Sequence, residues 1–179
     1  RPGSEGVDLD EELSRVIPVI EGLARSGQVV SCDTRKASVM RAALAAGAAI
    51  INDVSALQHD PGSLAAMAEA ECPVILMHAQ GDPKTMQLSP NYADVALDVF
   101  DALEDRIAAC VAAGIAKERL IADPGIGFGK SFRHNLDLLH QFPDLAFLVD
   151  PQLAVYDLHL RSGIVETGID DLPRPRGDV

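Results

Sequence analysis

The chain has 179 residues, a formal net charge of −12, and a composition that is 47% hydrophobic but only 4% aromatic. Its length allows one domain with a sizeable core built from aliphatic side chains. The acidic balance argues against a nucleic-acid partner, because neutralising phosphates takes an excess of Lys and Arg. No apolar run approaches the roughly 18 residues of a membrane span, so no membrane partner is predicted.

The three cysteines are odd in number and lie inside patterned segments. They are Cys32, Cys72 and Cys110. Reduced, buried thiols and no visible signal peptide are typical of a cytoplasmic protein. The chain begins at Arg1 within a Gly/Pro-rich loop, and we expect further sequence upstream of it.

Helix and strand patterns alternate along the chain up to about residue 140. The helical periods predict helices at about 8–26, 36–46, 61–70, 93–113 and 132–140. Short buried apolar runs predict strands at about 28–32, 48–51, 73–76 and 119–122. This rhythm favours a parallel sheet wrapped in helices, either a (β/α) barrel or a doubly wound sheet.

Each predicted strand ends at a polar side chain. These side chains are Asp33, the pair Asn52 and Asp53, His78, and Asp123. The carboxyl ends of parallel strands share one rim, where barrels place their catalytic groups. Carboxylates and an amide there suit a flat heterocycle with paired N–H donors, because a carboxylate accepts two parallel hydrogen bonds. The simpler interpretation of Asp123 is that it braces the glycine-rich turn that follows it.

Other candidate groups near this rim have structural interpretations. No second His or Cys stands at ligand spacing from His78, so we interpret it as a satisfied structural histidine. The loop cations Arg1, Lys84 and Lys130 are interpreted as solvated surface charges. GIGFG at 125–129 is not a GxGxxG fingerprint, and GxxxxGK[ST] is absent, which excludes dinucleotide and P-loop sites.

The character of the sequence changes after about residue 141. One apolar run, 145–149, predicts a further strand. Beyond Pro151 both the helical and the strand periods are poor, and the chain ends in PRPRGDV. We therefore expect one domain over residues 1–150 and a divergent or disordered tail over residues 151–179.

Five ordered segments of this chain resemble dihydropteroate synthase, of the pterin-binding family. They are RPGSEG at 1–6, the dipeptide DT at 33–34, IINDVSAL at 50–57, PVILMHAQGDPKTMQ at 73–87 and IADPGIGFGKSFRHNLDLL at 121–139. The match runs from Arg1 to about Leu139. The pattern MHxQGxPxTMQ favours the synthase over the related corrinoid-linked methyltetrahydrofolate methyltransferases.

The resemblance implies an α/β fold of the (β/α)8 TIM-barrel type, incomplete in this chain, with 1–150 as a partial barrel domain. It implies a transferase of folate biosynthesis that condenses 4-aminobenzoate with (7,8-dihydropterin-6-yl)methyl diphosphate, giving dihydropteroate and pyrophosphate. Mg2+ would accompany the diphosphate as cofactor. Its partners would be these small-molecule substrates and, in a homodimer, a second copy, and sulfonamides would target the enzyme.

The resemblance also assigns residues to each substrate. The pterin positions are Asp33, Asn52, Val54, Met77, Asp123, Gly127 and Phe128. The aminobenzoate positions are Arg1, Pro2 and Phe128. Asp33 and Asp123 are the catalytic positions: Asp123 would hold the amino-pyrimidinone edge, and Asp33 would stabilise the cation that develops as pyrophosphate leaves. Asn52 would contact a neighbouring ring nitrogen and the amino group.

Three anion-binding features of the family have no counterpart in this sequence. The metal-binding Asn is expected upstream of Arg1, so no metal ligand is expected in this chain. The Ser-Arg-Lys motif, expected near 150–165, and the later Arg-x-His are absent. We predict that the chain keeps the pterin slot but lacks much of the diphosphate site. A non-catalytic pterin-binding fragment that pairs with another copy is therefore an alternative, beside the methyltransferase.

Overall fold

The structure is a computed structural model that describes residues 6–81, 84–149 and 165–167. The described strands form one parallel sheet in the order β4-β3-β2-β1-β5. The strands are β1 (Val30–Asp33), β2 (Ile50–Asp53), β3 (Val74–Met77), β4 (Leu120–Asp123) and β5 (Val165–Thr167). The helices are α1 (Leu9–Arg25), α2 (Ala37–Ala45), α3 (Ser63–Glu69), α4 (Val95–Ala112), the 3-10 turn η1 (Lys117–Arg119) and α5 (Phe132–Val149).

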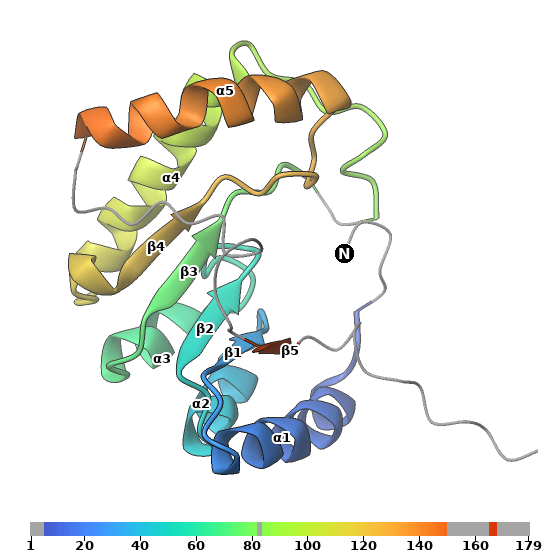
Figure 1. Ribbon diagram of the computed structural model, residues 1–179, viewed down its shortest axis with the longest axis vertical. Coiled ribbons are helices and arrows are strands. Elements are labelled where there is room, and N and C mark those ends of the chain that lie inside the picture. Colours follow the sequence, from blue (N-terminus) through green and yellow to red (C-terminus); the bar gives the residue numbers. More distant parts are fainter. Residues whose placement is uncertain (1–5, 82–83, 150–164, 168–179) are drawn as a thin grey trace, which may run out of the picture.

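The position of the helices on the sheet identifies it as part of a barrel. From β1 to β4 the strands follow the chain across the sheet without a reversal. Because β5 returns to the edge beside β1, the strand order alone does not exclude a doubly wound sheet. A doubly wound sheet, however, carries helices on both of its faces. Figure 1 shows α2, α3 and α4 on the same side of the sheet, as in the outer layer of a (β/α) barrel. The predicted incomplete barrel is confirmed, and the doubly wound alternative is wrong.

The elements predicted before α5 are confirmed to within a few residues at their ends, whereas α5 begins at residue 132 as predicted but continues to Val149 instead of ending at about residue 140. The first helix begins as its sequence indicates, because the Asp8 carboxylate accepts a hydrogen bond from the Glu11 amide at 2.9 Å. Its apolar stripe buries Val16 and Ile20 against the sheet-side core. The three cysteines are free, and Cys32 and Cys110 are buried. Within the described ranges, no helix combines the length and apolar character needed to cross a membrane.

The C-terminal part of the structure differs from the predictions. The run 145–149 continues α5, so the strand predicted there is wrong. A five-residue apolar run cannot be told from a buried helical segment by its periodicity alone. No strand was predicted at Val165–Thr167, which pairs in parallel with β1. The rest of the predicted tail, 151–179, lies outside the described residues.

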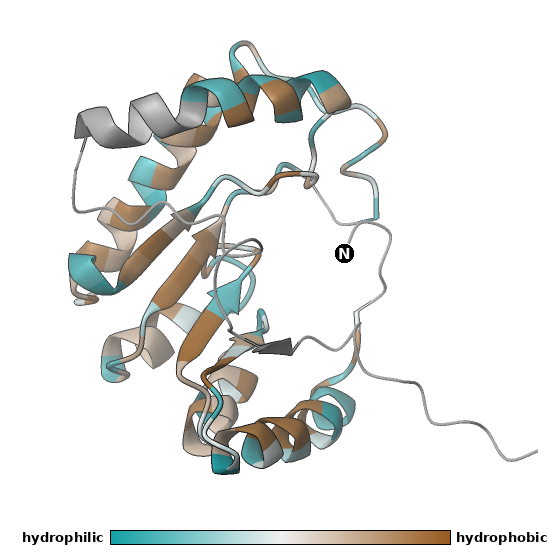
Figure 2. Ribbon diagram, viewed as in Figure 1, coloured by the Kyte–Doolittle hydropathy of each residue, from teal (hydrophilic) through white to brown (hydrophobic). Residues whose placement is uncertain are grey.

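The two faces of the sheet have different chemistry. Successive residues of a strand point to opposite faces. One set joins the buried core beneath the helices and includes Cys32, Ile51, Leu76 and Ala122. In Figure 2 the apolar colour covers β3 and β4, whereas β2 turns hydrophilic at its arrowhead. The neighbours of the core residues in each strand, among them Asn52, therefore point to the opposite face.

Glu12 ties α1 to the segment after β1. It is only 8% exposed and accepts hydrogen bonds from Thr34 Oγ1 and Lys36 Nζ, each at 2.5 Å. We expect Glu12→Ala to lower the free energy of unfolding by about 2–3 kcal/mol in urea titrations, because it leaves a cation without its partner. The control is Glu11→Ala, whose partner Arg15 lies on the surface, with an expected loss below about 1 kcal/mol. Equal losses would contradict this role.

Candidate functional site

The polar ends of β1, β2 and β4 lie on one face of the sheet. Asp33 is the register partner of Asn52, and Asn52 is the partner of Ile75. Met77, two residues beyond Ile75 and thus on the same face, is the partner of Asp123. The register alone therefore brings Asp33, Asn52 and Asp123 to one face, at the carboxyl ends of the strands. This confirms the predicted shared rim for these three side chains. The prediction was wrong for Asp53, which follows Asn52 in the strand and is buried on the opposite face.

These side chains are partly shielded from water. Asn52 is 8% exposed, while Asp33 and Asp123 are half-buried. Asp123 Oδ1 accepts a hydrogen bond from the Gly125 amide at 2.7 Å. The bracing interpretation of Asp123 is thus confirmed. It leaves room for a ligand role, because a carboxylate has about four acceptor positions.

A cavity of about 400 Å³ lies at the carboxyl end of β3, where Met77 lines it, and Asp33, Asn52 and Asp123 are not among its lining residues. Three of the predicted pterin residues line it together, Val54, Met77 and Phe128, with Leu103 and Arg106 of α4 on another wall. Gly127 lies in the same loop as Phe128, between β4 and α5. The predicted aminobenzoate residues Arg1 and Pro2 lie outside the described residues.

Asp53 has a structural role that separates it from its neighbour Asn52. It is fully buried and accepts hydrogen bonds from Ser55 N at 2.7 Å, Ser55 Oγ at 2.6 Å and Leu57 N at 3.1 Å. Burial raises the pKa of this carboxyl group, and the bonds from Ser55 and Leu57 act against that rise. Ala56 and Leu57 adopt left-handed backbone conformations, with φ of 50° and 61°. Asp53 therefore holds a strained loop that lines the cavity.

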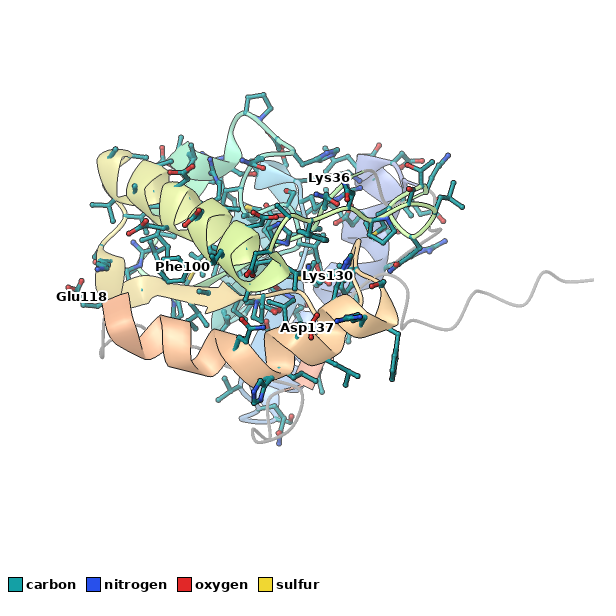
Figure 3. The ribbon with its side chains drawn as sticks, turned by 90° about the horizontal axis from the view of Figure 1, so that it is seen from above. Lys36, Phe100, Glu118, Lys130 and Asp137 are labelled. Carbon is teal, nitrogen blue, oxygen red and sulfur yellow. The ribbon has the colours of Figure 1, made fainter. Side chains whose placement is uncertain are left out.

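Lys130 is the residue that the sequence interpretation placed wrongly. It is 3% exposed rather than solvated. Its Nζ donates to the carbonyl oxygens of Gly125 and Phe128, both at 2.9 Å, and of His78 at 3.3 Å. Burial lowers the pKa of Lys130 to about 7, and the nearby Asp123 carboxylate opposes this shift. Figure 3 places Lys130 near the start of α5, far from Glu118 at the other end of the sheet.

The comparison with protein families decides the relationship. The family model described as "Pterin binding enzyme" matches residues 1–155 of this chain. The chain belongs to the pterin-binding enzyme family.

Its relatives in the pterin-binding enzyme family include several dihydropteroate synthases. The synthase of Escherichia coli (strain K12) is 51% identical over 140 residues, which cover 78% of this chain and 49% of the relative. The synthase of Synechocystis sp. (strain PCC 6803) is 41% identical over 154 residues, which cover 86% of this chain and 53% of the relative. The chain therefore spans about half the length of the curated relatives it matches.

Solved structures of pterin-binding enzymes match the fold as well. The Yersinia pestis dihydropteroate synthase with a sulfonamide drug is 49% identical, with a TM-score of 0.78 over 81% of this chain and 53% of that one. The Xanthomonas albilineans synthase with 4-aminobenzoic acid is 50% identical, with a TM-score of 0.76 over 83% and 52%. The Burkholderia cenocepacia synthase complexed with 7,8-dihydropteroate is 47% identical, with a TM-score of 0.74 over 80% and 52%.

His78 fits a structural role in this pterin-binding enzyme. Its Nδ1 lies 3.1 Å from Lys130 Nζ, and its ring stands 6.1 Å from that of Tyr92. Burial, and secondarily the Lys130 charge, lower the pKa of His78 to about 4, so the imidazole is neutral at pH 7.

Within the described part of the chain, no group of three His, Cys, Asp or Glu side chains could hold a metal ion.

Proposed function

We propose that this protein is a dihydropteroate synthase of folate biosynthesis. It would condense 4-aminobenzoate with (7,8-dihydropterin-6-yl)methyl diphosphate and release dihydropteroate and pyrophosphate. The observation that carries the proposal is the convergence of Asp33, Asn52 and Asp123 on one face at the strand ends. The identity of 41–51% to named synthases supports it.

In the proposed enzyme the pterin ring lies against this face. The Asp123 carboxylate accepts two hydrogen bonds from the amino-pyrimidinone edge, as carboxylates do from other paired N–H donors. Asn52 both donates and accepts, which suits a ring nitrogen next to an amino group. Val54, Met77 and Phe128 line the adjoining cavity and supply apolar contact to the flat ring.

The chemical step needs charge stabilisation rather than a side-chain nucleophile. The C–O bond between the pterin methylene group and the diphosphate breaks, and its electron pair leaves with pyrophosphate. Asp33, beside the dihydropyrazine ring, stabilises the cation that develops on the pterin. The aminobenzoate nitrogen then forms the new C–N bond and loses a proton.

The second substrate would bind next to the pterin, with Phe128 between the two sites. Support for this placement comes from the Xanthomonas albilineans synthase, whose structure holds 4-aminobenzoic acid. By resemblance, Arg1 and Pro2 would belong to the loop that closes over this substrate. The same site would bind sulfonamides, as the drug complex of the Yersinia pestis synthase suggests.

The cofactor and the assembly are further parts of the proposal. Mg2+ would accompany the diphosphate, as the resemblance implies. The described residues do not fit a metal site by themselves, because they include no cluster of three ligating side chains. A cytoplasmic homodimer is proposed on the same resemblance, and the free cysteines suit a reducing compartment.

The alternatives are less well supported. A corrinoid-linked methyltransferase would share the pterin pocket, but the relatives and structures reported above are synthases. A non-catalytic pterin-binding fragment would keep the Asp33, Asn52 and Asp123 face without turnover. Pyrophosphate release in the presence of 4-aminobenzoate separates the synthase from both.

Binding measurements test the proposal on this chain directly. We expect 6-hydroxymethylpterin to bind in a fluorescence titration. Its diphosphate should bind with little added affinity, because the described strand ends present carboxylates and an amide rather than cations. Failure of both ligands to bind would contradict a surviving pterin slot. A diphosphate affinity more than about 100-fold higher would contradict the predicted loss of the diphosphate site.

A further inference from the structure

Two loops at the strand ends touch through their backbones. One is the glycine-rich loop 124–131, between β4 and α5, and the other is the segment 78–80, after β3. A Cβ atom on Gly125 would overlap the His78 carbonyl oxygen, and one on Gly129 would overlap the Gln80 carbonyl oxygen. The glycines thus allow an approach that any side chain would prevent.

Side chains from both flanks tie down the same glycine-rich loop. Tyr92 Oη donates to the Gly129 carbonyl at 2.8 Å, and Gln87 Nε2 donates to the Gly127 carbonyl. Asn135 of α5 accepts from the Gly127 amide at 2.8 Å. The loop that carries Phe128 is therefore held from the side of α4 and from the side of α5.

The Lys130 ammonium group lies at the junction of the two loops. It donates to Gly125 and Phe128 in one loop and to His78 in the other, so a single group joins both. A buried ammonium group loses hydration and lowers folding stability unless its contacts offset that cost. A methionine of similar length would fill the space without that cost. This makes a purely packing role a poor explanation for a charge here.

We infer that Lys130 is a positioning residue for the pterin site. Its ammonium group donates to the carbonyl of Gly125, a residue whose N–H donates to Asp123, and to the carbonyl of Phe128, a residue whose side chain lines the cavity. Lys130 thereby sets the distance between the carboxylate that takes the pterin edge and the wall that takes its face. The inference rests on the proposed function, because the pterin is the ligand that needs this distance.

Protonation of Lys130 gives a readout that a packing role would not produce. The pKa of about 7 means that the amine loses charge and one donor as the pH rises through neutrality. The groups facing the junction from other elements are Asp123, His78, Tyr92 with its neighbour Asp98, and His134 in ring contact with Tyr92. His78, with a pKa of about 4, and Tyr92, with a pKa raised to about 12, stay neutral from pH 6 to 8.5.

The test compares Lys130→Met and Lys130→Arg with the wild-type chain by titration of 6-hydroxymethylpterin. Lys130→Met should bind about tenfold more weakly or worse at about pH 6, with an unchanged circular dichroism spectrum. Wild-type affinity should fall between about pH 6 and pH 8.5 by more than that of Lys130→Arg, whose guanidinium stays charged. Titration of the pterin itself is common to all three proteins and cancels.

The outcomes separate this inference from the proposed function. No pterin binding by the wild-type chain would overturn the proposed function and, with it, this role of Lys130. Wild-type binding with an unchanged dissociation constant in folded Lys130→Met would overturn the inference alone. If Lys130→Met does not fold, the pH dependence decides, and equal curves for the wild type and Lys130→Arg would overturn the inference.

Discussion

Replacing Asp123 by Asn is expected to weaken pterin binding by about 100-fold, or about 2.7 kcal/mol. Asn keeps an Oδ1 atom that can accept the Gly125 amide hydrogen, now bound at 2.7 Å, so the turn is preserved. It replaces the other carboxylate oxygen by an NH2 group and removes the charge. The proposed pterin presents two parallel N–H donors, and one of them would then face the NH2 group, which is also a donor. Removing one partner of a buried, hydrogen-bonded charge pair costs about 2–5 kcal/mol of binding free energy.

The same experiment includes a control and a change of ligand. Asp137→Asn, on α5, serves as the control, because its side chain is 43% exposed and its partner Arg133 lies 3.8 Å away on the surface. Lumazine carries a carbonyl in place of the pterin amino group. The ratio of lumazine affinity to pterin affinity should therefore be higher for Asp123→Asn than for the wild-type chain. An unchanged ratio of the two affinities would show that Asp123 does not read the amino-pyrimidinone edge.

The sequence was sufficient to predict the repeating elements and the rim. The apolar runs that stop at Asp33, Asn52 and Asp123 show where the strands lie in the sequence. Parallel pairing then brings the carboxyl ends of these strands together. The separation of Asn52 from Asp53 also follows from the alternation of faces along a strand. It was missed because the two residues were treated as one strand ending. Alternation alone does not say which of the two faces the helices, because Ile50 and Ile51 are both apolar; in the structure Ile51 is buried beneath the helices, so Asn52 faces away from them.

The burial of Lys130 could not be predicted from local sequence. Its partner His78 is 52 positions away, and no periodicity shows which loops touch across a sheet. Three glycines before a lysine indicate a turn with many exposed carbonyls, but they do not say that a cation lies inside it. The pairing of Val165–Thr167 with β1 was missed for the same reason. A three-residue strand has too few positions to show alternation.

Gly125→Ala is expected to lower the free energy of unfolding by about 3 kcal/mol or more, as measured by urea denaturation. Gly125 has φ of +66°, which costs a residue with a Cβ atom about 1–2 kcal/mol. The new Cβ would also overlap the His78 carbonyl, a backbone atom that cannot turn aside as a flexible side chain can. Relieving the overlap would move the two loops apart and stretch the Lys130 contacts to both.

Gly127→Ala isolates the collision from the backbone strain. Gly127 has φ of +87° in the same loop, but a Cβ atom there would meet nothing within 4 Å. It should therefore show only the conformational cost of about 1–2 kcal/mol. The difference between the two variants measures the contact between the loops. If both variants lose the same stability, the loops are not in contact, and Lys130 cannot join them as inferred.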